Sequence, residues 1–347
     1  MRKPSISFLT SLLIFIIVSC SLFGTDLIDV VYTWVDGSDP QWQALLEKYS
    51  QKAPGEVTAR AVAKRRFKDH DELRYSLRSI YQFAPWVNHI YIVTFGQRPT
   101  WLKETSMISI VDHQDIFTNP NDLPTFNSMA IECHLHNIPN LQEHYLYFND
   151  DVFLGAPTTP QDYFTPEDKM KIFLSKRRIP TGDPVPGEEG FFAASKNTGT
   201  LLDATYEPAS RYMHAHTPYP TLKSFVASLE KQFSTIFAAV SSHRFRSLHD
   251  YTITNGLIPY AALYTGHGEL ISDQRTTLSF GADPSHDIKM FKKLLLDRPR
   301  FFCIQDGADD ENPLSLSLLS SFFNEYYPLP APWEKKLDRA DEDHPKI

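Results

Sequence analysis

Two short runs of the sequence place carboxylates just after apolar segments typical of buried strands. Tyr145–Phe148 leads to Asp150 and Asp151, and Phe301–Ile304 leads to Asp306. Ligands bind at the carboxyl ends of strands in open α/β sheets. Oxygen ligands suit Mg²⁺ and Mn²⁺, which can bridge a diphosphate. We therefore expect these three aspartates to form a metal site, with a turn closed by Asx hydrogen bonds as the alternative for the adjacent pair.

A pair of arginines offers a second candidate site. Arg74 and Arg78 lie four residues apart within Asp69–Trp86, whose apolar spacing predicts a helix, so they share one helix face. Their planar guanidinium groups could together bind a phosphate. The alternative is a solvent-exposed face on which they pair with Asp71 and Glu72.

A histidine and a third arginine could act on the reacting groups. His216 lies in the proline-restricted run His214–Pro220, which suits a fixed general base or a side chain that stabilises a transferred phosphoryl group. With His214 it also has a spacing that could ligate a metal, although a surface loop histidine is the usual case. Arg246, within His243–Asp250, is equally ambiguous when considered alone.

Composition limits the class of protein. The chain has 347 residues, 42% hydrophobic and 13% aromatic, enough to bury the core of one large domain or of two closely packed ones. Its net charge of -8 and pI near 5.9 argue against broad nucleic-acid binding, because polyanion-binding proteins usually present a basic face. An anionic ligand would therefore be held locally, by a few arginines or a metal.

The three cysteines, Cys20, Cys133 and Cys303, cannot form a disulfide framework, and no CxxC pattern suggests structural zinc. At most one internal bridge, between Cys133 and Cys303, is possible. Buried free cysteine is the commoner state, and we expect it here.

The N-terminus differs from the rest of the chain. Arg2 and Lys3 precede an apolar, uncharged run over residues 6–24, which predicts a signal peptide or a membrane anchor. Ile17–Cys20 also resembles a lipobox, in which Cys20 would be lipidated after cleavage. We expect this segment to direct the chain to a membrane, most simply as a signal anchor, while the side of the membrane stays open.

Strand and helix patterns alternate along the chain, which predicts an α/β layered domain. Asp69 and Glu72 occupy capping-box positions at the start of the first predicted helix. The expected elements are strands at 27–35, 89–95, 107–112, 145–148 and 301–304, helices at 69–86 and 129–137, an irregular segment at 157–190, a mostly helical stretch at 219–264 and a final helix.

This organisation predicts four segments. Residues 1–25 are the signal peptide or anchor, 26–165 an α/β core that binds a nucleotide sugar, 166–336 a loop-rich and helical part that completes the site, and 337–347 a charged tail. The irregular segment within the third of these is the kind of long loop that often covers a substrate.

Taken together, the sequence resembles the four motif regions of the Stealth family, which includes bacterial capsular-polysaccharide phosphotransferases and the lysosomal-enzyme N-acetylglucosamine-1-phosphotransferase. Departures are Thr200, where some relatives have arginine, and Gln305, which replaces a common asparagine. The runs that resemble the family are Ile28–Asp39, Arg66–Ser79, Ala84–Val87, Ile92–Thr94, Gly96–Gln97, Pro99, His113–Asp115, Leu123–Ser128, Asn149–Asp151, Ser195–Gly199, Ala215–Pro218, Arg246–Asp250, Cys303–Asp306 and Pro332–Glu334.

The resemblance implies a Rossmann-like or GT-A-like sheet, with a helical C-terminal portion that completes the site. It also implies an enzyme that moves a hexose 1-phosphate, for example N-acetylhexosamine 1-phosphate, from a nucleotide-diphosphosugar to a saccharide hydroxyl, with release of a nucleoside monophosphate. Mg²⁺ or Mn²⁺ would be held by Asp151 and Asp306, with Asp150, while Arg246 would stabilise phosphoryl charge and His216 would accept the hydroxyl proton or orient the phosphoryl group. The expected nucleotide-sugar-binding residues are Tyr32, Trp34, Asp36, Asp39, Arg74, Arg78, Asn127 and Asn149.

Two other functions fit the same residues. A GT-A-like metal-dependent glycosyltransferase would use the same donor but break the C–O bond and release a nucleoside diphosphate. A non-catalytic carbohydrate-binding protein would release no nucleotide. The nucleotide product therefore separates the three hypotheses.

Overall fold

The computed structural model describes residues 27–51, 61–272, 275–307 and 312–335. The predicted anchor at 1–25 and the charged tail at 337–347 lie outside the described residues. Among the helices that are described, none is both long and apolar enough to span a bilayer.

The main sheet has five strands in the order β3-β2-β1-β4-β9. The first four run parallel, and β9 runs antiparallel to β4. Near-continuous apolar runs such as the one in β1 are typical of parallel strands covered on both faces. The strands are β1 (Ile28–Thr33), β2 (Ile90–Thr94), β3 (Ile108–Asp112), β4 (His144–Asn149) and β9 (Tyr219–Leu222).

The strand order reverses beside β1, since β2 and β3 lie on one side of it and β4 on the other. In open α/β sheets, ligands bind outside the carboxyl ends of the strands at such a point. The carboxyl ends of β1 and β4 meet there, because Thr33 is in register with Asn149. The residues that follow these two strands are therefore the first candidates for a ligand site.

A second, three-stranded sheet lies beside the first and is ordered β11-β12-β5. The strand β5 (Val152–Leu154) follows directly after β4, and β12 (Phe301–Asp306) pairs antiparallel with it and parallel with β11 (Arg275–Phe280). The amide of Ile304 donates to the carbonyl of Asp151 at 3.0 Å. This pairing brings the end of β12 to the turn between β4 and β5.

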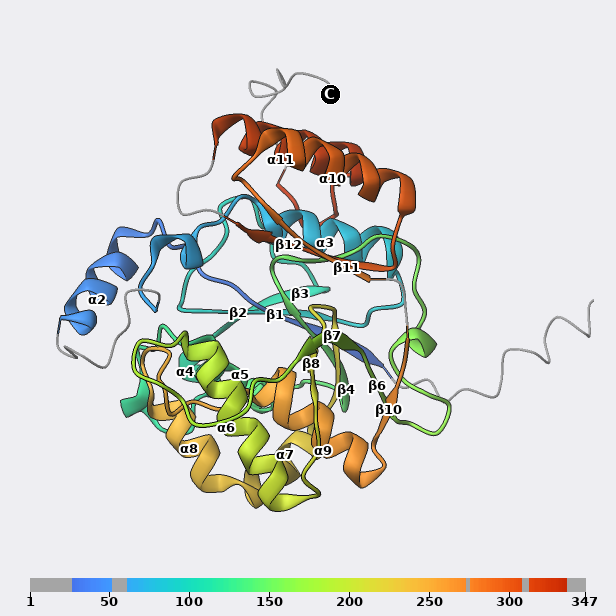
Figure 1. The fold of residues 1–347 in the computed structure, drawn as a ribbon. Coiled ribbons are helices and arrows are strands. Elements are labelled where there is room, and N and C mark those ends of the chain that lie inside the picture. The colour runs from blue at the N-terminus through green and yellow to red at the C-terminus, as the bar shows by residue number, and fades with distance from the viewer. Residues whose placement is uncertain (1–26, 52–60, 273–274, 308–311, 336–347) are drawn as a thin grey trace, which may run out of the picture.

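Helices cover both sides of these sheets (Figure 1). In this view α3 (Glu72–Phe83) lies above the main sheet, with α10 (Pro284–Asp297) and α11 (Pro313–Tyr326) above it. A single-turn helix, α4 (His113–Ile116), follows β3, and α2 (Pro40–Ser50) lies to one side. The helices below the main sheet are α5 (Ser128–Glu132), α6 (Gly190–Thr205), α7 (Lys223–Gln232), α8 (Ser234–Ser242) and α9 (Ile258–Thr265).

One large hydrophobic cluster joins the two predicted parts of the chain. It includes Ile28 and Leu77 from the first part and Phe323 and Trp333 from the second. The ring of Tyr75 stacks on Phe323 with centroids 4.7 Å apart. The C-terminal helices therefore pack on the same core as the main sheet.

The segment predicted to be irregular contains regular structure, which corrects that expectation. Within 157–190, β6 (Met170–Ile172) pairs with β10 (Gly268–Leu270), and β7 (Leu174–Arg178) pairs with β8 (Tyr212–His214). Both partner strands come from later in the chain. Local spacing cannot reveal such pairings, since their hydrogen bonds are made between distant segments.

Two predicted helices differ in detail. The helix expected at 69–86 begins at Glu72, and its N-cap residue Asp71 has φ 67° and no side-chain cap bond, so the capping box is wrong. The helix expected at 129–137 is split into α5 and a 3-10 turn over Leu135–Asn137. The imidazole of His134 there bonds to Ser241 at 2.8 Å, a tertiary contact of the kind that overrides local propensity.

The two described cysteines are both buried and free. Cys133 lies at the end of α5 and Cys303 in the middle of β12. The expectation of free thiols at these two positions is confirmed, while Cys20 lies outside the described residues.

Candidate active site

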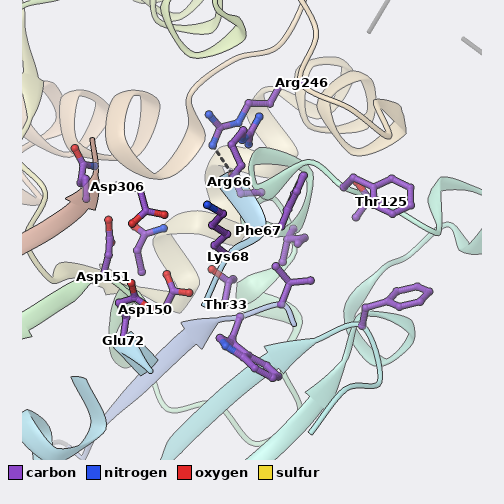
Figure 2. Close-up of a pocket in the computed structure, with 18 of the residues that line it drawn as sticks. Thr33, Arg66, Phe67, Lys68, Glu72, Thr125, Asp150, Asp151, Arg246 and Asp306 are labelled. Carbon is purple, nitrogen blue, oxygen red and sulfur yellow. Dashed lines mark hydrogen bonds between the residues drawn. The ribbon is translucent and has the colours of Figure 1, made fainter. Parts of the chain in front are cut away.

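A pocket of about 470 Å³ opens at the carboxyl ends of β1, β4 and β12. Carboxylates lie at one end, basic side chains at another, and aromatic rings line a third side (Figure 2). The predicted residues that line it are Trp34, Asn149, Asp150, Asp151, His216, Arg246 and Asp306.

The acidic end gathers four carboxylates from three elements. Asp150 and Asp151 form the turn between β4 and β5, Asp306 ends β12, and Glu72 begins α3. Figure 2 shows these side chains grouped on one side of the pocket. The strand pairing described above and the packing of α3 on β5 fix this arrangement.

The acidic side chains raise one another's pKa values. Burial, followed by repulsion from Asp151 and Asp69, holds the pKa of Asp150 well above its ordinary value. Burial and repulsion from Asp69, Asp150 and Asp306 do the same for Glu72. Like charges this close favour either proton uptake or a bound cation.

The donor atoms at this end suit a divalent cation. The ligand atoms of His70, Glu72 and Asp306 all lie within 4.8 Å of one another. Oδ1 of Asp151 is buried and has no hydrogen-bond partner in the described part of the chain. An oxygen-rich group with an orphaned carboxylate oxygen is the chemistry that hard cations require.

His216 lies on the wall beside Asp151. It belongs to the segment between β8 and β9, which is held by a 2.7 Å hydrogen bond from the amide of Ala215 to the carbonyl of Phe173. Burial raises the pKa of Asp151, and the nearby His216 acts to lower it. Nδ1 of His216 is buried and makes no hydrogen bond within the described residues. The ring is therefore placed for proton transfer or ligation rather than for a structural bond.

The basic end consists of Arg66, Lys68 and Arg246. In Figure 2, Lys68 lies between the carboxylates and the two arginines. Nη2 of Arg246 donates to Oγ of Ser128 at 3.1 Å, whereas its buried Nε has no partner among the described residues. Burial lowers the pKa of Arg246, opposed by the nearby Glu132. A guanidinium held this way can add further bonds to an anionic ligand.

The loop that carries Arg246 is organised around the fully buried Asp250. Its carboxylate accepts hydrogen bonds from His243 Nδ1 at 2.7 Å, Asn127 Nδ2 at 3.0 Å and the amide of Ser247 at 2.8 Å. The side chain of Asn127 also accepts from the amide of Met129 and so caps α5. Asn127, one of the predicted nucleotide-sugar-binding residues, therefore supports this loop and does not line the pocket.

Aromatic rings from several segments form a third side of the pocket. Trp34 follows β1, and its indole Nε1 donates to Asp69 Oδ2 at 3.0 Å. Trp42 packs edge-on against Phe67 and Phe126, with centroids 4.7 and 5.4 Å away. These rings, with Phe95, give the pocket an aromatic surface against which a planar ring could pack.

Tyr32, one of the predicted nucleotide-sugar-binding residues, is a core residue and does not line the pocket. Its ring packs on Phe148 with centroids 5.1 Å apart, and its hydroxyl bonds to Ser76 Oγ at 2.7 Å. Successive strand residues point to opposite faces of the sheet. Tyr32 consequently faces α3, whereas the neighbouring Thr33 lines the pocket.

Asp36 and Asp39 stabilise the chain after β1 and do not line the pocket. Asp39 caps α2 by accepting from the amide of Gln41 at 2.8 Å, and it also accepts from Gln97 Nε2 at 2.9 Å. Asp36 accepts from the amide of Ser38 at 2.8 Å. Both carboxylates make the short-range bonds typical of helix starts and Asx turns.

Arg74 and Arg78 are likewise absent from the pocket lining. Both donate to Glu334, Arg74 through Nε at 2.7 Å and Arg78 through Nε at 2.7 Å. Residues two apart on a helix differ by about 200° around its axis. Since Glu72 faces the pocket, Arg74 points to the opposite side, and Arg78, one turn later, follows it.

Several pocket residues had no assigned role in the sequence interpretation. Arg66, Lys68 and Glu72 belong to one charged run that ends at the first residue of α3, and Glu189 precedes α6. His70, in the same run, does not line the pocket but is a possible metal ligand beside Glu72 and Asp306. The density of charge at 66–72 was the available signal. The choice between a surface turn and a ligand site depends on the strands that meet this run, which local spacing does not show.

Models of four Stealth protein conserved regions match the chain in sequence order. Conserved region 1 matches residues 28–53, region 2 residues 66–172, region 3 residues 215–261 and region 4 residues 292–344. The acidic turn and Arg66 fall in region 2, His216 and Arg246 in region 3, and Asp306 in region 4.

Curated relatives include proteins named exopolysaccharide phosphotransferase. One from Streptomyces coelicolor is 39% identical over 312 residues, covering 89% of this chain and 52% of that protein. CpsY of Mycobacterium tuberculosis strain H37Rv is 37% identical over 314 residues, covering 89% of this chain and 58% of that protein. The chain thus spans little more than half the length of these relatives.

Among solved structures, mouse xyloside xylosyltransferase 1 in its apo form aligns with a TM-score of 0.36 and 8% identity, over 80% of this chain and 96% of that one. A similarity this weak supports no conclusion about the site. The four matched regions, in order and together with the relatives, carry the classification: the chain belongs to the Stealth protein family.

Proposed function

We propose that the chain transfers a hexose 1-phosphate, such as N-acetylhexosamine 1-phosphate, from a nucleotide-diphosphosugar to a saccharide hydroxyl in exopolysaccharide synthesis. The single observation that carries this proposal is the charge division of one pocket, with carboxylates at one end and three basic side chains at another. A diphosphate can lie between a cation and arginine or lysine donors. The curated relatives are named exopolysaccharide phosphotransferases, which supports the coarser part of the proposal, a phosphotransferase in exopolysaccharide synthesis.

Asp150, Asp151 and Asp306, joined by Glu72, would hold Mg²⁺ or Mn²⁺. When bound, the cation would neutralise charge on the diphosphate and on the leaving phosphate oxygen. The protein contributes a fixed group of oxygen atoms, since three of these residues end or join paired strands.

Arg246, Lys68 and Arg66 would bind the oxygens of the transferred phosphoryl group. The buried position of Arg246 and its bond to Ser128 orient the guanidinium before substrate arrives. Donors fixed in advance stabilise developing charge without the cost of reorganisation. This is the contribution expected of the basic end during transfer.

His216 would accept the proton of the acceptor hydroxyl. In the proposed reaction a bond forms between that oxygen and the phosphorus next to the sugar, while the bond from this phosphorus to the bridging oxygen breaks. Nucleoside monophosphate leaves with the bridging oxygen, and the proton passes to His216. The carboxylate of Asp151 beside the ring would stabilise the resulting imidazolium.

The aromatic side would bind the nucleoside. Trp34 lies just after β1, and Phe67 lies near the start of the charged run at 66–72. A nucleotide base could stack or pack edge-on against their rings. The sugar would then lie toward the carboxylates and the acceptor toward His216.

The nucleotide product tests the proposal. The full chain would be incubated with nucleotide-sugar donors, saccharide acceptors and Mg²⁺ or Mn²⁺, and the released nucleotide identified by mass spectrometry. Nucleoside monophosphate together with a phosphodiester-linked product is expected, and both should disappear in His216→Ala. Release of nucleoside diphosphate would instead support a glycosyltransferase, and release of neither across the donor panel a binding protein.

We also propose that residues 1–25 attach the chain to a membrane, as a signal anchor or through Cys20. The support is the apolar run with two preceding basic residues. Fractionation of cells that produce the full chain, compared with a variant lacking residues 2–25, tests this. Equal recovery of both from the membrane fraction would contradict it.

A further inference from the structure

We propose that Asp151, His216 and Cys303 form a binding site for a soft divalent cation such as Zn²⁺, and that its occupancy blocks the pocket. The ligand atoms of the three side chains all lie within 4.8 Å of one another. Sγ of Cys303 is 3.3 Å from Oδ2 of Asp151. Zinc bonds of roughly 2.0 to 2.3 Å place neighbouring tetrahedral ligands at such separations.

Strand pairing fixes two of the three ligands, Cys303 within β12 and Asp151 in the turn just before β5. Cys303 is in register with Val152, the residue after Asp151, and the amide of Ile304 donates to the carbonyl of Asp151. His216 is fixed between the bond of Ala215 to Phe173 and the start of β9. A site whose ligands are fixed before binding loses little free energy on ordering them.

The donor set selects the class of cation. Thiolate and imidazole favour zinc and cadmium, whereas Mg²⁺ and Mn²⁺ gain little from sulfur. The second group of possible ligands, His70, Glu72 and Asp306, contains no sulfur. The group Asp151, His216 and Cys303 therefore prefers a softer cation than the group His70, Glu72 and Asp306 does.

Two polar atoms beside Cys303 are available to bind a cation. Oδ1 of Asp151 and Nδ1 of His216 are buried and make no hydrogen bonds within the described part of the chain. Both residues also line the pocket, so a fourth, open position would face it. Three protein ligands with one open position is the arrangement of zinc sites that can exchange a ligand.

Blocking of the pocket rests on the proposed function, whereas binding does not. A soft cation held here would occupy Asp151 and His216, which the proposed transfer requires for the cation and for the proton. Zn²⁺ should then inhibit turnover even in the presence of excess Mn²⁺, because zinc binds such donors more tightly than manganese does.

Cadmium provides a binding test that is independent of turnover. The full chain, stripped with a chelator, would be titrated with Cd²⁺ while the ultraviolet cadmium–thiolate charge-transfer absorption is recorded. We expect a band that saturates near one equivalent, is lost in Cys303→Ser and is kept in Cys133→Ser, the matched change at the other buried free thiol. Both variants retain Cys20, so its contribution cancels.

His216→Ala is the second variant, in case the serine change disturbs the β12 pairing. It should weaken cadmium binding about tenfold or more while the thiolate band persists at saturation, as expected when one of three ligands is lost. Absence of the band in the unaltered chain, or its equal loss in Cys133→Ser, would overturn the proposed site.

A separate experiment tests inhibition. Nucleotide release is measured with a fixed Mn²⁺ concentration and increasing Zn²⁺ concentrations, and the rate of each variant is compared with its own rate without zinc. The zinc concentration for half inhibition should rise at least tenfold in Cys303→Ser relative to Cys133→Ser. A cadmium band without any zinc effect on turnover would overturn the blocking step alone. A chain that binds cadmium but releases no nucleotide from any donor would count against the proposed function and not against the site.

Discussion

Arg78 and Glu334 form a buried ion pair between residues 256 positions apart in the sequence. Nε and Nη2 of the arginine donate to the two carboxylate oxygens at 2.7 and 2.8 Å. A third donor of Arg78 bonds to the carbonyl of Tyr327 at 3.0 Å. The pair joins α3, whose first residue lines the pocket, to the C-terminal segment that packs on the same core.

Glu334→Gln should destabilise the fold without changing how the pocket responds to metal. Removing one partner of a buried pair leaves an uncompensated charge, which costs about 3 to 5 kcal/mol. Urea denaturation measures this loss, with the exposed Glu325→Gln as a matched control expected to stay within about 0.5 kcal/mol. If Glu334→Gln instead kept the denaturation midpoint of the unaltered chain and needed more metal for activity, Arg74 and Arg78 would act at the ligand site, as the sequence predicted.

The same pair predicts an acid-sensitive contribution to stability. Burial acts to raise the pKa of Glu334, but hydrogen bonds from Arg78, Ala331 and Arg74 outweigh it, and the net pKa lies below the ordinary value of 4.5. A carboxyl with a lowered folded pKa contributes stability above its unfolded pKa and loses it as the pH falls through the folded one. Below about pH 4 the difference between the unaltered chain and Glu334→Gln should therefore shrink.

The sequence predicted the pocket well where a residue follows a strand. Asp151 and Asp306 follow apolar runs, and the antiparallel pairing of β12 with β5 brings the two positions together. Arg78 shows where this fails, because its partner Glu334 is brought to it by tertiary packing of the C-terminal segment. Tyr32 lies within β1 and packs in the core against Phe148 and Ser76, whereas Thr33 and Trp34, at and just after the end of the strand, line the pocket. The strands β6, β7 and β8 could not be predicted, since their partners lie far along the chain.

Asp151→Asn and Asp306→Asn should each weaken the metal response and turnover together. Each removes a charged oxygen ligand from the acidic end while preserving shape. We expect turnover to fall about 100-fold or more, in line with the loss of a group that stabilises transferred charge. The Mn²⁺-induced rise in unfolding temperature provides the second readout, and the exposed Asp297→Asn on α10 is the control. Normal turnover in either variant would remove that residue from the mechanism.

Without metal, the acidic end should contribute a stability penalty that grows as the pH rises above the ordinary carboxyl pKa of about 4. Burial and mutual repulsion raise the pKa values of Asp150 and Glu72, so the unfolded chain ionises first and the folded state binds more protons over this range. A bound cation reverses the penalty. Thermal unfolding in chelator and in Mn²⁺ should show a metal-induced increase that is larger at pH 8 than at pH 5. An increase that is equal at both pH values would contradict the assignment.

Asp250→Asn should impair transfer by releasing the loop that carries Arg246. The fully buried carboxylate accepts from His243, Asn127 and Ser247, and an amide in its place cannot accept from all three in the same way. We expect kcat to fall about tenfold or more with a smaller change in metal affinity, because the acidic end is separate. Proportional loss of metal binding and kcat would indicate general unfolding instead. The conservative Asp250→Glu should recover little, since the site is closely packed.

Glu132, at the end of α5, supplies a stability effect whose size depends on pH. Burial raises its pKa from 4.5 to about 7, against hydrogen bonding from Thr254 and attraction to Arg246. Because the unfolded chain loses this proton first, the folded state is destabilised progressively as the pH rises from about 4.5 to 7, by up to about 3 kcal/mol. Glutamine mimics the protonated acid. Glu132→Gln should thus match the unaltered chain near pH 4.5 and exceed its free energy of unfolding at pH 8, while Glu325→Gln shows no such divergence. An equal difference in free energy of unfolding between the two proteins at pH 4.5 and pH 8 would show that burial does not raise the pKa of Glu132.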